Sequence, residues 1–271
     1  MVEGYDMERR IIDMHQHLDD TDPDAMAEEY RRLGVVKAVL LARSPHRRAN
    51  SNEEVLAAHK KHPDLYVPFF GYDLDLMQPA ELERARDQGF VGIKFIGPQK
   101  AYNDPEYFPA YEEASDLGII GLFHLGVVCN IPPWDDCDSN LMRPIHLDHI
   151  ARSFPEFKII GAHLGNPWYE EATMSCRWNP NLFFDLSGST LKKKTPEFLA
   201  GLLWWTPDTA YKSPDRTYAW QKIVYGSDVA LEMIEDVVND YQKLMDALDM
   251  APELREAVWY KTAAKLLGLE A

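Results

Sequence analysis

The feature that most constrains this chain is a regular series of eight short apolar segments. Each holds five to eight residues, is rich in β-branched or aromatic side chains, and ends in polar residues or glycine, as buried strands do. Their ends recur about every 30 residues, roughly the length of a strand, a loop, a helix and a return loop together. We therefore expect eight strands, at residues 10–15, 35–42, 66–72, 91–96, 119–125, 158–164, 182–186 and 222–228.

Between these strands the spacing of apolar residues changes to that of amphipathic helices. Several of these segments begin at a proline or after a capping residue, and several stop at a glycine. Near-continuous apolar strands that alternate with helices are typical of a parallel sheet covered by helices. The expected helices are residues 23–33, 52–62, 79–88, 107–117, 145–154, 234–248 and 252–267.

Eight such units in 271 residues favour one closed (β/α)8 barrel, a TIM barrel, that occupies residues 1–271 as a single domain. The alternative is an open doubly wound sheet. It is the weaker prediction because no Gly-x-Gly-x-x-Gly follows the first strand and no Walker A motif occurs. In a barrel, the two long connections at 126–143 and 188–217 lie on the catalytic face, where they shape substrate access.

The balance of charges narrows the classes of partner. The chain has 28 Lys and Arg against 44 Asp and Glu, a formal net charge of −16, so nucleic acid is not expected as a partner. No apolar run reaches the roughly 18 residues of a membrane helix, and the first ten residues hold no apolar signal region. The three cysteines form no Cys-x-x-Cys pair. We expect a cytoplasmic protein with a small-molecule substrate and no membrane partner, and we leave homo-oligomer formation open.

Ionisable side chains lie inside or at the ends of five of the expected strands. His15 and His17 alternate at the end of the first strand, so both imidazoles can face one ion. Such side chains are costly to bury unless they are paired or bind a metal. Imidazole and carboxylate donors without thiolate favour zinc, manganese or iron. The remaining members lie in or close the fourth, fifth, sixth and eighth strands: Lys94, His124, His163 and Asp228.

Each of these residues also has a purely structural interpretation. Alternating histidines are common, and a single histidine at a strand end is more often a satisfied structural residue. Asp228, which follows Gly226 and Ser227, could cap a helix. The coincidence of four histidines, one lysine and one aspartate at the ends of five strands favours a functional site.

Two arginines and a tryptophan are candidate substrate-binding residues. Arg43 and Arg47 follow the second strand, where forked guanidinium hydrogen bonds could hold a substrate carboxylate. A solvated charged loop is the alternative. Trp168 lies beside the loop after the sixth strand and could line an aromatic pocket, or pack in the core or a lid.

Several stretches, spread over nearly the whole chain, carry a resemblance to a known family. They are IIDMHQH at 11–17, VGIKF at 91–95, HLG at 124–126, FPEFKIIGAHLG at 154–165, NPNLFFDLSG at 179–188, KIVYGSD at 222–228 and AAKLLGL at 263–269. In their combination the chain resembles the amidohydrolase superfamily. Within it, the chain is similar to the compact branch of aminocarboxymuconate-semialdehyde decarboxylase, γ-resorcylate decarboxylase and lactone or amide hydrolases.

The resemblance implies a barrel that binds a divalent ion at the strand ends. It implies His15 and His17 as ligands, joined by His163 or His124, with Asp228 as a ligand or proton shuttle. The resemblance also implies that Asp13, which precedes the two histidines, orients a metal ligand by a hydrogen bond without binding the metal itself.

The chain also departs from the family pattern. Some decarboxylases of the branch begin with Glu-x-His where this chain has Asp13, as the hydrolase-like members do. The tail, which usually reads near Gly-Asn-Ala, reads YKTA at 260–263. Lys94 matches the position of a carbamylated lysine that bridges two ions in binuclear members. A single ion beside an ordinary lysine amine is our first expectation.

Residues and resemblance together favour metal-dependent hydrolysis of a small carboxylate-bearing or cyclic amide, ester or lactone substrate. Zinc is the first expectation for the ion and manganese the second. Asp228 would move the proton of the attacking water, and His163 or His124 would hydrogen-bond the oxyanion. Lys94 would pair with the substrate carboxylate, with Asp228, or with carbon dioxide as a carbamate. The alternative reaction is non-oxidative decarboxylation of an aromatic or unsaturated acid, and a binding protein on a relict barrel is a third hypothesis.

Overall fold

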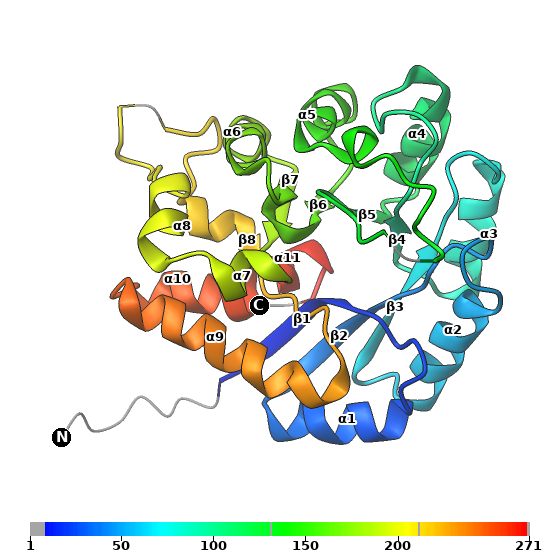
Figure 1. Cartoon of the computed structure of the whole chain (residues 1–271), viewed down its shortest axis with the longest axis horizontal. Coiled ribbons are helices and arrows are strands. Elements are labelled where there is room, and N and C mark those ends of the chain that lie inside the picture. The colour runs from blue at the N-terminus through cyan, green and yellow to red at the C-terminus, as the bar shows by residue number, and fades with distance from the viewer. Residues whose placement is uncertain (1–8, 131, 211, 270–271) are drawn as a thin grey trace.

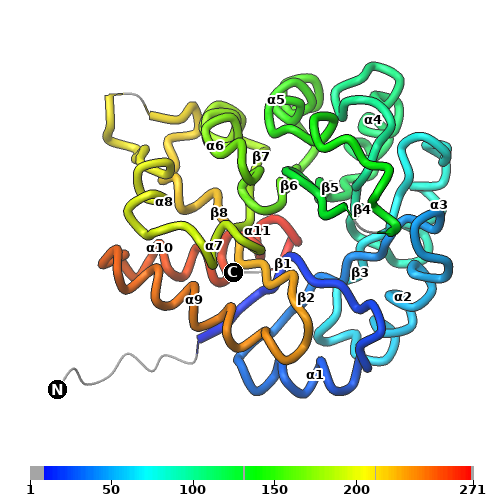
Figure 2. The backbone as a smooth tube through the Cα atoms, viewed as in Figure 1, coloured from blue at the N-terminus to red at the C-terminus, as the bar shows by residue number. Residues whose placement is uncertain are grey.

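The computed structural model describes residues 9–130, 132–210 and 212–269, and its strands follow one another around a single parallel sheet. Each strand pairs with the next in the chain, and the helices lie outside the ring (Figure 1). The colours in Figure 2 follow the same circular path from β1 to β8. The strands are β1 (Ile11–Gln16), β2 (Val35–Leu41), β3 (Tyr66–Gly71), β4 (Gly92–Phe95), β5 (Ile120–Phe123), β6 (Ile159–Gly161), β7 (Leu182–Asp185) and β8 (Ile223–Val224).

The seam between β8 and β1 is bridged by backbone hydrogen bonds. The Met14 amide donates to the Tyr225 carbonyl at 2.9 Å, and the Asp228 amide donates to the His15 carbonyl at 2.7 Å. These bonds bring the two ends of the sheet together, so the chain forms the predicted (β/α)8 barrel. The second bond also fixes Asp228 beside His15, and closure of the barrel therefore helps to build the site.

The helices occupy the connections between the strands, and most of the predicted ones are present within two residues of their expected ends. Four of them begin at proline, whose missing amide hydrogen costs nothing in a first turn. The helices are α1 (Pro23–Arg32), α2 (Ser51–Lys61), α3 (Ala80–Gln88), α4 (Phe108–Asp116), α5 (Pro144–Ser153), α6 (Tyr169–Trp178), α7 (Ser189–Lys193), α8 (Pro196–Leu202), α9 (Ile234–Ala247), α10 (Pro252–Glu256) and α11 (Thr262–Leu266).

Three helices were missed by the sequence pattern, namely α6, α7 and α8. The α6 helix begins after Trp168, which is not a capping residue, so the sequence shows no start signal there. The α7 and α8 helices are five and seven residues long, too short for a helical period to show. The connection at 188–217 is therefore partly helical rather than one long loop.

Several strands are shorter than the apolar runs that predicted them. The clearest case is β6, which stops at Gly161 although the run continues to residue 164. His163 and Leu164 have φ angles of 60° and 48°, in the left-handed region, so the chain turns sharply there. The apolar run continues past the strand because Ala162 and Leu164 are still buried in the turn. Since the residues are apolar in both the strand and the turn, the sequence could not show where the backbone changes direction. Among the described residues, no helix is both long and apolar enough to cross a membrane.

Gly126, just after β5, is expected to be a stability determinant. A Cβ atom there would lie 2.0 Å from the Asn166 carbonyl oxygen, and the backbone has a φ of +99°. We expect Gly126→Ala to lower the free energy of unfolding by about 2 kcal/mol or more. Gly118→Ala is the matched control, because Gly118 also has a positive φ (+66°) but nothing lies within 4 Å of its added Cβ. Its expected cost is about 1 kcal/mol. Urea unfolding of both variants tests this, and equal losses would contradict it.

Candidate metal centre

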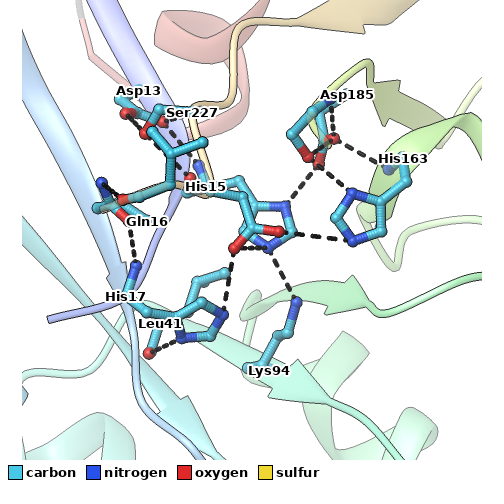
Figure 3. Close-up of polar contacts among 12 residues, drawn as sticks. Asp13, His15, Gln16, His17, Leu41, Lys94, His163, Asp185 and Ser227 are labelled. Carbon is cyan, nitrogen blue, oxygen red and sulfur yellow. Dashed lines mark hydrogen bonds and ion pairs between the residues drawn. The ribbon is translucent and has the colours of Figure 1, made fainter. Parts of the chain in front are cut away.

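His15 and His17 present the same ring nitrogen to the mouth of the barrel. The Nδ1 atom of His15 donates to Asp185 Oδ2 at 2.8 Å, and Nδ1 of His17 donates to the Leu41 carbonyl at 2.8 Å. Both acceptors lack a proton to give, so each imidazole carries its hydrogen on Nδ1. The Nε2 atoms are left to face the barrel mouth, on the side into which Lys94 also points (Figure 3).

Asp228 faces these lone pairs from the end of β8. Its Oδ1 lies 3.7 Å from His15 Nε2 and 3.9 Å from His17 Nε2, and its Oδ2 lies 3.6 Å from His163 Nε2. These separations are too long for hydrogen bonds but suit donors that share one ion at about 2 Å from each. Burial alone would raise the pKa of Asp228, but the facing imidazoles outweigh it and hold the pKa below its ordinary value. Asp228 has a φ of 46°, so its left-handed backbone is one that a plain strand would not supply.

His15, His17 and Asp228 meet the distance requirement for a shared metal ion, and the chemistry of the donor set supports it. Burial, together with the nearby Arg43 guanidinium, holds the pKa of His17 well below its usual range, so the imidazole is neutral and able to bind a metal. Each histidine is also oriented through Nδ1, as metal-ligating histidines usually are. The residues present therefore fit a divalent ion.

Asp185 at the end of β7 is a site residue that the sequence analysis missed. Besides the His15 ring, it accepts hydrogen bonds from the backbone amides of His163 and Ser187. Burial alone would raise the pKa of Asp185, but the contacts with His15, His163 and Ser187 together outweigh it and hold the pKa below its ordinary value. The available signal was a single carboxylate in an otherwise apolar run, LFFDL at 182–186.

His163 is tied to the same carboxylate through a serine. Its Nδ1 donates to Ser187 Oγ at 2.8 Å, and Ser187 Oγ donates to Asp185 Oδ1 at 2.5 Å. This chain leaves the His163 Nε2 lone pair facing Asp228. Burial lowers the pKa of His163, so the ring is neutral and can accept a proton or a ligand bond. One carboxylate thus orients two histidines, one on β1 and one in the turn that follows β6.

Replacement of Asp185 should weaken metal binding without removing a predicted ligand. We expect Asp185→Asn to raise the Kd for zinc by about 10- to 100-fold, because the His15 ring loses its charged acceptor. Asp246→Asn removes a surface carboxylate that pairs with Arg255 and serves as the control. Competition with a chromophoric chelator gives both constants, and an unchanged Kd in Asp185→Asn would contradict the orienting role.

Lys94 and His124 point into the same space. The Lys94 side chain is 2% exposed, and its Nζ donates to His15 Nε2 at 3.2 Å (Figure 3). Burial lowers the pKa of Lys94 to about 8. Lys94 therefore points into the barrel mouth, as the expected pairing with a substrate carboxylate or Asp228 requires. His124 Nε2 is buried with no hydrogen-bond partner among the described residues, and its ring lies 5.0 Å from that of His163. Burial holds the pKa of His124 well below its usual range, so its free nitrogen suits a fourth ligand.

Asp13 accepts hydrogen bonds from backbone amides and not from the ring of either histidine. Its carboxylate accepts from the amides of His15 and Ser227 and from the hydroxyl of Tyr30. Asp13 therefore fixes the seam between β1 and β8, and Asp185 contacts the His15 ring. Burial raises the pKa of Asp13 to about 6, against the effect of these hydrogen bonds.

A cavity of about 300 Å³ lies beside the centre, and Arg43 is part of its wall. Arg43 donates from Nε and Nη2 to the two oxygens of Asp19, each at 2.8 Å, which leaves Nη1 for a ligand. The lining residues are Gln16, His17, Asp19, Thr21, Arg43, Asp228, Val229 and Ala230.

The other two candidate substrate-binding residues lie elsewhere. Arg47 donates to the Pro133 carbonyl and to Asp136, and it thereby stabilises the connection at 126–143. It is not among the residues that line the cavity. The Trp168 ring lies 5.2 Å from the Arg143 guanidinium and is not among the lining residues. The structure thus brings Arg43, but not Arg47 or Trp168, to the cavity beside the centre.

Comparisons with known proteins agree with this fold. The family model described as "Amidohydrolase" matches residues 12–269. An amidohydrolase from Burkholderia multivorans, solved with bound zinc, aligns with a TM-score of 0.70 at 14% identity over 96% of this chain and 99% of its own. A probable 2-pyrone-4,6-dicarboxylic acid hydrolase from Acinetobacter baumannii gives 0.66 at 15% identity over 96% and 99%.

A decarboxylase shares the fold as well. The 2,6-dihydroxybenzoate decarboxylase from Rhizobium aligns with a TM-score of 0.65 at 16% identity over 96% of this chain and 98% of its own. At these identities the likeness is one of fold. No functionally curated protein sequence matches the chain.

Proposed function

Because this chain belongs to the amidohydrolase family, we propose that it is a metal-dependent hydrolase of a small carboxylate-bearing or cyclic amide, ester or lactone substrate. The observation that carries the proposal is the convergence of His15 Nε2, His17 Nε2 and the Asp228 carboxylate within reach of one ion. Zinc is the preferred ion for this donor set, with manganese as the second choice.

His15, His17 and Asp228 would hold the ion, with His124 or His163 as a further ligand. When bound, the ion supplies Lewis-acid polarisation of a carbonyl and lowers the pKa of water. Asp228 is placed to accept the proton of the attacking water and to pass it to the leaving group. His163 Nε2, 3.6 Å from Asp228 Oδ2, is placed to hold that proton in transit or to contact the oxyanion.

Arg43 and Lys94 would bind the negative charge of the substrate. Asp19 fixes the Arg43 guanidinium at the cavity wall and leaves Nη1 to donate to a carboxylate. Lys94 gives up its contact with His15 Nε2 if that nitrogen binds the ion, and its amine is then available to a substrate oxygen. Bound in this way, a substrate carboxylate would lie beside the reacting carbonyl.

Non-oxidative decarboxylation of an aromatic or unsaturated acid is the second candidate. The observation that favours it is the nearly equal fold similarity to the decarboxylase and to the hydrolase. In this reaction Arg43 and Lys94 would hold the departing carboxylate, and Asp228, after taking up a proton from solvent water, would deliver it to the ring carbon as carbon dioxide leaves.

Metal analysis and isotope labelling test the proposal. Protein prepared without chelator should contain about one equivalent of zinc or manganese per chain. Less than about a tenth of an equivalent, both as prepared and after reconstitution, would refute a metal site. For turnover, 2-pyrone-4,6-dicarboxylate and 2,6-dihydroxybenzoate are the first probes. A hydrolase incorporates ¹⁸O from labelled water into its product, whereas a decarboxylase releases carbon dioxide and incorporates solvent deuterium at carbon.

A further inference from the structure

The turn that carries His163 is held by one short segment, residues 185–190, which runs from the end of β7 to the start of α7. The His163 amide donates to Asp185 Oδ1 at 2.9 Å, and the His163 carbonyl accepts from Thr190 Oγ1 at 2.6 Å. The Nδ1 atom of the ring contacts Ser187 Oγ at 2.8 Å. Strained backbone, such as the left-handed φ of 60° at His163, persists only where the surrounding structure holds it. These three contacts therefore fix both the backbone and the ring of His163.

The direction of the hydrogen bonds through Ser187 is determined by Asp185. Ser187 is fully buried, and its Oγ lies 2.5 Å from Asp185 Oδ1. The same oxygen accepts from the backbone amides of His163 and Ser187, each at 2.9 Å, so it carries no proton and can only accept. The single hydroxyl proton of Ser187 therefore points to Asp185, and the serine oxygen has only lone pairs to offer His163. It follows that Nδ1 of His163 carries the ring proton.

Asp228 favours the opposite arrangement of the His163 ring. The Nε2 atom of His163 lies 3.6 Å from Asp228 Oδ2, and this carboxylate would attract a proton on that nitrogen (Figure 3). A ring protonated at Nε2 could neither bind a metal nor accept a proton there. The 2.8 Å contact with Ser187 is within hydrogen-bonding range, whereas the 3.6 Å contact with Asp228 is not. The structure thus favours the tautomer that Ser187 requires, with the Nε2 lone pair facing the barrel mouth.

We propose that Ser187 is a positioning residue for the reaction, because it sets the Nδ1–H tautomer of His163 and so keeps Nε2 able to accept a proton. The inference rests on the proposed function, in which His163 takes part in turnover. Ser187 acts only through His163. Its side chain is fully buried, and it neither lines the cavity beside the centre nor belongs to a group of side chains that could hold an ion.

Nitrogen NMR of the zinc-loaded full chain, labelled with ¹⁵N in histidine, tests the tautomer directly. The His163 signals are assigned by their loss in His163→Gln. In the wild type Nδ1 should be the protonated nitrogen and Nε2 the unprotonated one, and Ser187→Ala should lose this single tautomer. Ser213→Ala is the matched control, because Ser213 is also buried but donates to the Thr217 carbonyl, and it should leave the His163 signals unchanged. A Ser187→Ala variant in which His163 keeps the Nδ1–H tautomer as fully as the wild type would overturn the proposal.

Turnover of the substrate identified by isotope labelling tests the consequence for the reaction. Ser187→Ala should lower kcat at least about 10-fold, because the wrong tautomer cannot accept a proton at Nε2, while KM stays within about threefold. Its zinc content should match that of the wild type, because Asp185 keeps its contact with His15. Ser187→Cys, which returns a weak donor of similar size, should recover part of the lost kcat.

The failure of this inference is distinct from the failure of the proposed function. An active wild type whose kcat is unchanged by Ser187→Ala would overturn the positioning role and leave the proposed function intact. A zinc-loaded wild type without turnover would refute the proposed function and, with it, the role of Ser187 in the reaction. The tautomer of His163 is measured without turnover in either case.

Discussion

Asp228→Asn is expected to lower kcat by at least about 10²-fold while the protein stays folded, because asparagine cannot exchange the proton that the reaction moves. The substitution keeps the size of the side chain and one carbonyl oxygen for the ion. It also keeps the backbone hydrogen bond from residue 228 to the His15 carbonyl, so the seam of the barrel should remain closed. The measurement is steady-state turnover of a validated substrate.

Metal content on the same samples is the control, because loss of the ion would mimic loss of the proton shuttle. Turnover should therefore be expressed per bound ion. An Asp228→Asn variant that retains its metal and turns over within about threefold of the wild type would reduce Asp228 to a ligand or a cap.

His17→Ala is expected to abolish high-affinity metal binding, with the content falling from about one equivalent to less than about a tenth. His17 provides one of the three donors that face a common point, and only two would remain from that group. The fold should survive, because the lost contact is a single hydrogen bond from Nδ1 to the Leu41 carbonyl. Elemental analysis gives the metal content, and circular dichroism checks the fold.

His59→Ala is the matched control for this prediction. Its Nδ1 also contacts a strand carbonyl, that of Tyr66 at 2.7 Å, but it belongs to neither ligand cluster. We expect its metal content to match that of the wild type. A full equivalent of metal in His17→Ala would show that the ion is held by other residues, with His15, His163 and Asp185 as the next group to test.

The sequence by itself determined the barrel and most of the side chains at its mouth. A short apolar run is stable only when it is buried, whichever element it packs against. The number and spacing of these runs therefore predicted eight strands without any knowledge of their contacts. The carboxyl ends of parallel strands lie at one end of the barrel. Residues at or just beyond the ends of different strands, such as His15, His163 and Asp228, therefore meet. This inference requires only the order of the strands, and of the residues that follow them, along the chain.

The tertiary structure alone decided how those side chains are held. Asp185 is separated from His15 by 170 residues, and only closure of the barrel makes it the acceptor of the His15 Nδ1 proton. The left-handed turn at His163 depends on the chain packed around it, and an apolar run cannot encode a φ angle. The same holds for Arg43 and Arg47, which lie four residues apart. Arg43 lies at the cavity because it is hydrogen-bonded to Asp19, whereas Arg47 is hydrogen-bonded to Asp136 and lies away from the cavity. Hydrogen bonds between segments that are distant in the sequence cannot be predicted from the local pattern of residues.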